Sequence, residues 1–430
     1  MLKAGFAKLD VTPPFGTGIA GYFRERKVKG ILDPIYLCCL AVEKDGERLL
    51  IITGDFMGIK MGVCKRMAES IEARTGVPAT SVIVQALHPH TSTALNTQPV
   101  LNHVHEGTYF DLVMMKAGDV AELALADLEE ATVAGATGEV AEKISFVRRY
   151  FMKDGTVKTN PGFDKAADII GPCDEPDNSV RLLRFKREKG NIALVNFACH
   201  PDVIGGELLS ADWPGFVRRF VEAEHPGTAC IFCNGFQGDS NHFHYMSGVR
   251  KGGYEHSRFM GRVVADAVNA LWEQVTPIKA DSVGVKSETV YTKTRMEELE
   301  RYDELKAFHD AYWAGKLDYT PSGEEIARAR RVTDLLTAPI FRPIPVTVAH
   351  IGDVILAGIG GEPFTYYIRA VRALCPDKTV LTLCAANGFE GYFPTAKAFV
   401  EGGYEAASSP FTPAIENEIL STVEKLIKAQ

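Results

Sequence analysis

Residues 49–90 read LLIITGDFMGIKMGVCKRMAESIEARTGVPATSVIVQALHPH, and this stretch decides the fold class. It opens with apolar residues that end at Gly54-Asp55, which predicts a buried strand. Residues 60–75 carry apolar side chains at helical spacing and stop before Gly76-Val77-Pro78, so they predict a helix. Residues 81–85 are apolar again and predict a second strand. Strands alternating with helices in this way are typical of layered α/β proteins.

The same alternation continues along the chain and predicts a mixed α+β architecture. The further predicted helices are 107–131, 213–224, 253–275 and 413–428, and the further strands are 181–187, 191–198, 228–233, 346–351, 354–357 and 379–384. Turn residues between neighbouring strands predict two hairpins, one around 188–190 and one around 352–353. The fold class is therefore α/β, in the mixed α+β sense.

Residues 295–335 differ from the rest because they are charged, helical in pattern and poor in β-branched residues. They predict an inserted helical hairpin that is broken at 319–322. The sequence shows no internal repeat, low-complexity segment or linker-like stretch. We expect one large catalytic domain over residues 1–430 that includes this insertion.

The composition is that of an ordinary globular protein, with 46% hydrophobic residues, 24% charged residues and a net charge of −8. Its acidic balance and small basic clusters argue against nucleic acid or anionic lipid as the main partner. No apolar run is long enough to cross a bilayer, and the start lacks a signal-peptide pattern. The nine scattered cysteines favour free, buried thiols in a reducing compartment. These features predict a cytoplasmic protein without a stable membrane anchor, acting on a small molecule.

Eleven histidines are present, and several gather in groups at His88-Pro-His90, His103-Val-His105, His200 and His242-Phe-His244. His88 and His90 follow the strand pattern of residues 81–87, at the strand end where open α/β sheets bind ligands. Pro89 biases His88 toward extended backbone, which would turn both rings the same way. The alternative is a pair of loop histidines that only make hydrogen bonds.

His200 stands in the same setting, directly after the strand pattern of residues 192–199. Two histidines at the ends of two buried strands can share one metal ion. Zinc accepts histidine nitrogen and carboxylate oxygen, and a catalytic zinc site keeps one position open. A single histidine here would more often belong to the core or a loop. The metal-site hypothesis therefore depends on finding histidines at the ends of two strands. Nearby, Asp212 is expected to cap the helix that Pro214 helps to start.

Other strand ends also carry polar residues. The glycines of Asn234-Gly-Phe-Gln-Gly-Asp-Ser-Asn241 allow tight turns that bring backbone N–H groups near a substrate, although a plain loop fits equally well. Glu362 lies among glycines after one strand, and Tyr392 and Tyr404 follow another. Each of these segments, taken alone, is an ordinary turn from strand to loop. Three nearby carboxylates are expected to be exposed, namely Glu390, Glu401 and Glu405.

Taken together, these segments resemble the neutral/alkaline (non-lysosomal) ceramidase family of zinc amidases, over nearly the whole chain. The motifs that carry the resemblance are AGFAKLDVTPP at 4–14, His88-Pro-His90, Asn196-Phe-Ala-Cys-His200-Pro, Ser210-Ala-Asp-Trp-Pro-Gly215, Asn234-Gly-Phe-Gln-Gly-Asp239, Gly361-Glu362-Pro-Phe, Gly391-Tyr392-Phe-Pro-Thr and Glu401-Gly-Gly-Tyr404-Glu. No single motif is decisive, but their number and order make the resemblance specific.

The resemblance implies a Zn2+ ion and a set of residues around it. The implied ligands are His88, His200, Glu362 and Tyr392. The residues that it places beside the metal are His90, Arg148 and Tyr404, and Arg149 directly follows Arg148.

The chain departs from the family at two places. Thr91-Ser-Thr-Ala94 replaces a Ser-Gly-Pro-like stretch, and Asn241 stands where the family carries a serine, with Ser240 one residue earlier. No secretion signal and no room for the family's C-terminal β-sandwich are apparent. These departures argue against a serine nucleophile and against a long-chain sphingolipid substrate.

We therefore expect a zinc-dependent hydrolase in which a metal-bound water attacks an amide bond of a small or polar substrate. His90 would move the proton or stabilise the oxyanion, and Arg148 and Tyr404 would bond the developing charge. A zinc lactonase or esterase is the first alternative. A non-catalytic homologue that only binds a metal or ligand is the second, and Asn241 is the feature that favours it.

Overall fold

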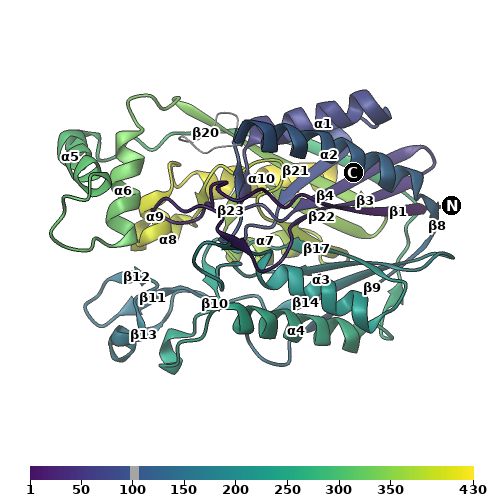
Figure 1. The fold of residues 1–430 in the computed structure, drawn as a ribbon, viewed down its shortest axis with the longest axis horizontal. Helices are drawn as coiled ribbons and strands as arrows, with labels where there is room; N and C mark the ends of the chain where they lie inside the picture. Colours follow the sequence, from purple (N-terminus) through teal and green to yellow (C-terminus); the bar gives the residue numbers. More distant parts are fainter. Residues whose placement is uncertain (97–105) are drawn as a thin grey trace.

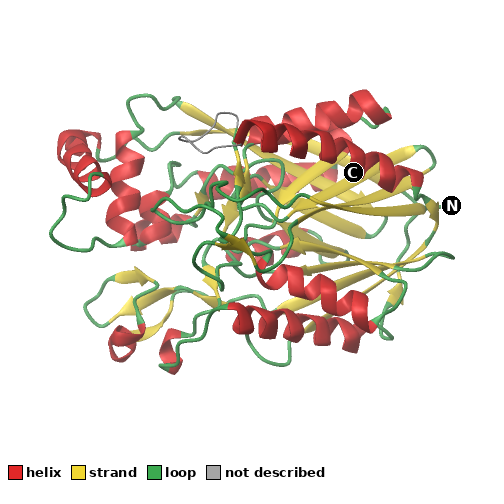
Figure 2. Ribbon diagram, viewed as in Figure 1, coloured by secondary structure: helices red, strands yellow, loops and turns green. Residues whose placement is uncertain are grey.

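The computed structural model describes residues 1–96 and 106–430. Helices α1 and α2 lie along one side, α3 and α4 lie along the opposite side, and β-sheets fill the space between them (Figures 1 and 2). This layered arrangement of helices and sheets confirms the predicted α/β, mixed α+β class.

The first sheet has the strand order β6-β4-β3-β1-β8. Its strands are β1 (Lys3–Asp10), β3 (Tyr36–Lys44), β4 (Glu47–Gly54), β6 (Val82–Ala86) and β8 (Glu129–Glu130). Helices α1 (Met61–Thr75) and α2 (Glu106–Ala126) cover its outer face. The helix predicted at 60–75 is confirmed, and it ends where Gly76 takes a left-handed φ of 72°. Helix α2 stops before the predicted residue 131 because residues 129–130 pair with β1.

The second sheet has the order β17-β15-β14-β9-β19. Its strands are β9 (Thr132–Glu139), β14 (Ser179–Lys186), β15 (Ile192–Phe197), β17 (Ala229–Asn234) and β19 (Thr276–Pro277). The predicted hairpin is confirmed as the antiparallel pair β14–β15. Helices α3 (Asp212–Glu224) and α4 (Tyr254–Leu271) pack on this sheet. Helix α4 ends before the predicted residue 275, because Gln274 N–H turns back to the Leu271 carbonyl and the chain enters β19.

The third sheet has the order β20-β21-β22-β24. Its strands are β20 (Val283–Lys293), β21 (Phe341–Ile351), β22 (Val354–Ile359) and β24 (Thr379–Leu383), and helices α7 (Tyr366–Leu374) and α10 (Ile415–Lys428) accompany it. Between β20 and β21 the predicted helical hairpin is confirmed as α5 (Tyr302–Trp313) and α6 (Gly323–Thr333). Ser322 caps α6 by accepting the Glu325 N–H while the Glu325 carboxylate accepts the Ser322 N–H, which is a complete capping box.

Short elements connect the three sheets and surround the strand ends. They are β2 (Gly30–Ile31), β5 (Gly58–Ile59), β7 (Ala94–Leu95), β10 (Phe146–Val147), β11 (Arg149–Met152), β12 (Val157–Thr159), β13 (Ile169–Pro172), β16 (Leu208–Leu209), β18 (Ser240–Asn241), β23 (Glu362–Pro363), β25 (Tyr392–Phe393), α8 (Ala396–Glu401) and α9 (Tyr404–Ser408). None of the helices in the described ranges is long and apolar enough to cross a membrane.

The three sheets share an apolar core. Leu40 and Ile51 of the first sheet, Leu194 of the second and Leu356 of the third belong to one cluster of fully buried side chains. Each such side chain contributes about 1.5–3 kcal/mol when it leaves water. Because apolar residues occupy both faces of these strands, polar side chains collect at the strand ends instead.

Buried amide side chains fasten the three sheets to one another near those ends. Gln85 on β6 donates through Nε2 to the carbonyl oxygens of Asn234 (2.7 Å) and Cys384 (2.8 Å). Asn196 on β15 donates through Nδ2 to the carbonyls of Cys233 and Thr382, both at 2.9 Å. The carboxyl ends of strands from three different sheets therefore meet at one place, where the predicted site residues follow them.

Candidate metal centre

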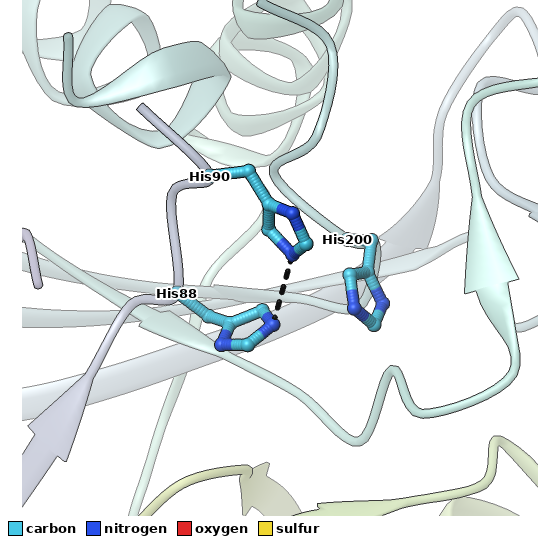
Figure 3. Close-up of side chains that lie close together, drawn as sticks. All are labelled: His88, His90 and His200. Atoms are coloured by element: carbon cyan, nitrogen blue, oxygen red, sulfur yellow. Dashed lines mark hydrogen bonds between the residues drawn. The ribbon is translucent and has the colours of Figure 1, made fainter. Parts of the chain in front are cut away.

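Three histidines converge at these strand ends. His88 and His90 follow β6 and His200 follows β15, and one ring nitrogen from each lies within 4.8 Å of the others (Figure 3). Nε2 of His90 lies 3.2 Å from Nε2 of His88. All three side chains are buried, with 1%, 7% and 0% exposure respectively. The prediction that His88 and His200 lie close together is therefore confirmed, and His90 lies with them.

The backbone at His88 does not follow the prediction. Its φ is 73°, in the left-handed region, so the expected extended conformation before Pro89 is wrong. The His88 N–H donates to the Phe56 carbonyl and the His90 N–H donates to the Pro201 carbonyl, both at 2.9 Å. These bonds hold a backbone conformation that costs about 1–3 kcal/mol in a non-glycine residue. Such strain is typical of functional sites, and here it turns two rings inward.

Backbone carbonyls fix the orientation of two rings. Nδ1 of His88 lies 2.6 Å from the Met57 carbonyl oxygen, and Nδ1 of His200 lies 3.0 Å from the Gln237 carbonyl oxygen. Since a carbonyl only accepts, each Nδ1 carries the proton and donates, which leaves each Nε2 unprotonated, with a lone pair that can bind a metal ion. Metal-binding histidines are commonly held in this way.

Glu362 completes the cluster with a carboxylate. Its Oε2 lies 3.1 Å from Nε2 of His200 and 3.5 Å from Nε2 of His88. Burial raises the pKa of Glu362, and His88 and Arg148 only partly offset that effect. Strand β23 pairs with β25 so that Glu362 lies opposite Tyr392.

The donor atoms fit a zinc ion. His200 Nε2 and Glu362 Oε2 are buried and have no hydrogen-bond partner among the described residues. A buried polar atom without a partner costs about 1–3 kcal/mol, so a further group at this point would satisfy both. Two imidazole nitrogens, one carboxylate and the Tyr392 phenol are nitrogen and oxygen donors of the kinds that zinc accepts. The four predicted ligands therefore lie together, while their role as ligands stays a prediction.

Arg148 also reaches this centre. It is buried, and it donates from Nε to Glu405 Oε1 (2.7 Å) and from Nη2 to the Gly238 carbonyl (2.8 Å). Its guanidinium carbon lies 5.4 Å from the Tyr392 ring centre and 6.0 Å from that of Tyr404. The structure thus brings Arg148 and Tyr404 next to Tyr392, while their place beside a metal ion stays a prediction.

The neighbouring Arg149 takes a different direction. It donates to the Gly402 carbonyl (2.7 Å) and to Glu401 (3.0 Å). Successive residues of an extended segment point to opposite faces, which separates the two arginines. Arg148, and not Arg149, is the arginine beside the centre.

The expectation that Glu405 is exposed is wrong. Glu405 is fully buried, and its two oxygens accept from Arg148 Nε and from the Thr159 hydroxyl (2.6 Å), with Arg149 Nη1 at 3.6 Å. Burial raises its pKa, but the attraction of the two arginines outweighs burial and holds the pKa below its ordinary value. Glu390 and Glu401 are only half-buried. No local sequence signal distinguishes Glu405 from these two.

Two residues of the site, Tyr22 and Asp202, were missed by the sequence reasoning. Asp202 Oδ1 lies 3.5 Å from Nδ1 of His90, and the Tyr22 hydroxyl donates to the same carboxylate oxygen. Burial raises the pKa of Asp202 to about 7, partly offset by the Tyr22 hydrogen bond. A signal was available, because Asp202 follows His200 across a proline, just as His90 follows His88. Tyr22 gives no such signal.

Asp212 was predicted to cap α3, and that assignment is wrong. Ala211 is the N-cap, and Asp212 is the first helical residue, with a φ of 52°. Its carboxylate accepts the N–H groups of Val203 (2.9 Å) and Ile204 (3.1 Å) as well as the Ser257 hydroxyl (2.7 Å). Asp212 therefore ties the loop after His200 to helix α4.

The polar groups of segment 234–241 make hydrogen bonds within the protein. The Gly235 N–H donates to Phe197 and the Gly238 N–H donates to Pro363, so backbone carbonyls occupy both groups. A Cβ at Gly238 would collide with the Glu362 carbonyl oxygen, so glycine is needed there for close approach. The Ser240 hydroxyl donates to the Gln237 carbonyl (3.2 Å), and Asn241 donates to Asn160 (2.7 Å).

His242 and His244 are not part of the cluster. His242 is buried without a hydrogen-bond partner for either ring nitrogen among the described residues, and it lies 5.7 Å from His256. His244 is exposed and stacks on Phe146 at 4.6 Å. His103 and His105 lie outside the described residues.

Two cavities meet at the site. We call the first, of about 310 Å³, the cationic chamber; its walls include His88, Glu362, Lys60, Arg330 and Arg342. We call the second, of about 910 Å³, the wide chamber; its walls include Arg148, Val157, Thr159, Asn160 and Asp202. Both chambers share Tyr22, Phe23, His90, Tyr392 and Tyr404, and residues at or just before α6 line each of them.

We expect protein purified without added metal to contain about one zinc ion per chain. The physical reason is the pair of buried, unpartnered donor atoms on His200 and Glu362. Elemental analysis of the purified protein measures the content directly. Chelation should also lower the melting temperature, since a ligand that binds only the folded state stabilises it. Transition metals at trace level in fresh protein would contradict the prediction.

The chain was compared with protein-family models, with curated protein sequences and with solved structures, and only solved structures match. No protein-family model matches the chain, and no curated protein sequence matches it. The neutral ceramidase from Pseudomonas aeruginosa is similar in structure, with a TM-score of 0.75 and 17% identity over 100% of this chain and 74% of that chain. A ceramidase complexed with C2 gives a TM-score of 0.74 and 16% identity over 100% and 75%. The chain therefore has a neutral-ceramidase-like fold.

Proposed function

We propose that this chain is a zinc-dependent hydrolase that cleaves the amide C–N bond of a small or polar substrate. The proposal depends above all on two buried atoms, His200 Nε2 and Glu362 Oε2, which lie 3.1 Å apart. Neither atom has a hydrogen-bond partner among the described residues. The neutral-ceramidase-like fold supports the same reaction class by analogy.

His88, His200, Glu362 and Tyr392 would hold the ion. When bound there, zinc acts as a Lewis acid on a carbonyl oxygen and lowers the pKa of water toward about 7. The carbonyls of Met57 and Gln237 keep both imidazoles in the tautomer that presents Nε2. The protein thus supplies donors whose orientation is fixed before any substrate enters.

In this proposal, His90 would move a proton. Its Nε2 faces the cluster and its Nδ1 faces Asp202 at 3.5 Å, so the two ring nitrogens connect the centre with a carboxylate. The Tyr22 hydroxyl in turn donates to Asp202, and Tyr22 is exposed. A proton taken up by His90 at the reacting centre could pass through Asp202 and Tyr22 to the solvent.

Arg148 and Tyr404 would stabilise negative charge on the substrate. Glu405 and the Gly238 carbonyl hold the guanidinium rigidly beside Tyr392. Burial raises the pKa of Tyr404 to about 12, so its hydroxyl stays protonated and can donate. Fixed donors aimed at developing charge are worth about 10²–10³-fold in rate.

A zinc lactonase or esterase would use the same groups in the same places. A homologue that binds without turnover is the alternative from another class. A panel of amides, esters and lactones assayed with the zinc-loaded protein distinguishes the three. Turnover of amides above esters and lactones is the expected result, and binding without any turnover would refute the proposal.

We expect the protein to hydrolyse long-chain ceramide slowly or not at all. Helix α6 and the residue directly after it bring Glu324, Arg330 and Asp334 to the walls of the two chambers, which suits polar groups better than long alkyl chains. We further propose a small-molecule substrate and a reducing compartment such as the cytoplasm, which the nine free cysteines support. Efficient turnover of micellar ceramide would overturn the substrate part.

Ser240→Ala is expected to lower kcat/KM by less than about tenfold, or about 1.4 kcal/mol. The Ser240 hydroxyl is fully buried and donates to the Gln237 carbonyl, so it is not poised as a nucleophile. His90→Ala and Tyr404→Phe, measured with the same substrate, should cost more, about 10²–10³-fold. A zinc-replete but inactive Ser240→Ala protein, with an acyl adduct trapped on Ser240 in the parent, would contradict this expectation.

A further inference from the structure

The wall of the cationic chamber contains a half-buried arginine, Arg342, without a close acidic partner among the described residues. It lies on β21, and Asp334 and Glu390 attract its guanidinium without forming an ion pair within 4.0 Å among the described residues. Its buried Nε has no hydrogen-bond partner among those residues. A guanidinium removed from water without an acceptor is costly, which makes it ready for an anionic ligand.

The other cations of the chamber are already engaged or exposed. Lys60 donates to the Phe389 carbonyl (2.6 Å) and lies 3.9 Å from Glu390. Arg331 is paired with Glu298. Arg330 is exposed at the chamber wall, where it adds positive charge without being fixed.

Strand β21 fixes the backbone position of Arg342. Arg342 lies opposite Thr292 in the long antiparallel pairing of β20 with β21, and it directly follows the helical insertion. Arginine presents a planar set of N–H groups that matches the two oxygens of a carboxylate or phosphate. The nearby carboxylates are Asp334, which is exposed, and Glu390, which faces Lys60.

We propose that Arg342 binds an anionic end group of the substrate, a carboxylate or a phosphate, in the cationic chamber. This inference rests on the proposed function, because the same cavity also contains His88, Glu362 and Tyr392. The scissile bond would lie at the residues common to both chambers, with the remaining part of the substrate in the wide chamber. The substrate class is then an amide that carries a negative charge on one side of the bond.

The kinetic test uses matched substrates that differ only in charge. N-succinyl and N-butyryl 4-nitroanilide probe the acyl side, N-acetyl-β-alanine and N-propylacetamide probe the amine side, and N-acetyl-phosphoethanolamine tests phosphate. At least one anionic member should exceed its neutral partner by roughly tenfold or more in kcat/KM. Arg342→Gln should bring that ratio toward one, Arg342→Lys should keep part of it, and Asp334→Asn should raise it. Arg258→Gln, an exposed charge loss on α4, is the control and should leave the ratio unchanged.

A binding test separates this inference from the proposed function. Succinate and inorganic phosphate are titrated calorimetrically into metal-free protein and into the Arg342→Gln variant. Binding that is at least about tenfold weaker in the variant supports the inference, even if no amide is hydrolysed, and the anion that binds identifies the end group. Equal affinity of the two proteins for both anions, or a charge preference that persists in Arg342→Gln, overturns it.

Discussion

Replacing His200 with alanine is expected to abolish zinc binding and hydrolysis while the protein stays folded. The substitution removes one of four predicted donors, the His200 Nε2 that lies 3.1 Å from Glu362 Oε2. Folding loses the bond from Nδ1 to the Gln237 carbonyl and gains a small cavity, a cost of about 1–3 kcal/mol. The bond from Trp213 to the His200 carbonyl involves only the backbone of His200 and remains possible.

Zinc content, kcat/KM and the melting temperature with and without chelator measure the outcome. His242→Ala is the matched control, because His242 is equally buried and lies outside the cluster. The control should keep its zinc and its response to chelator, and His200→Ala should lose both. Full metal content in His200→Ala would show that His200 is not a ligand.

Glu405→Gln is expected to destabilise the protein by about 3–5 kcal/mol at pH 7, because it leaves Arg148 and Arg149 buried without their shared counter-charge. Denaturant unfolding measures the change in the free energy of unfolding. Glu401→Gln is the matched control: Glu401 pairs with Arg149 but is partly open to solvent, so it should cost no more than about 1 kcal/mol. Equal effects of the two substitutions would contradict the buried triad.

The same variant has a defined pH dependence. The folded-state pKa of Glu405 lies below its ordinary value, because the two arginines outweigh burial. Its contribution to stability is therefore fully present above the unfolded pKa of about 4.3 and is lost as the pH falls through the folded value. The stability difference between parent and Glu405→Gln should be constant near neutral pH and shrink below about pH 4.5. A difference that grows on acidification would exclude this assignment.

The local pattern of the sequence was enough to predict most of the helices and strands. Apolar runs and turn residues located β4, α1 and β6, both hairpins and the helical insertion, because period and turn chemistry are properties of neighbouring residues. Helix ends were less well predicted: α2 and α4 stop early where the following residues join a sheet. Pairing with a distant strand is a tertiary effect that helix periodicity does not contain.

The sequence by itself determined which histidines stand at strand ends, since His88, His90 and His200 each follow an apolar strand. Only the tertiary structure decided that their rings meet, that His88 takes a left-handed φ, and that Glu405 is buried. The physical reason is that burial of a charge depends on its partners. Glu405 is far along the chain from both Arg148 and Thr159, and it becomes their neighbour only after the sheets and loops have packed.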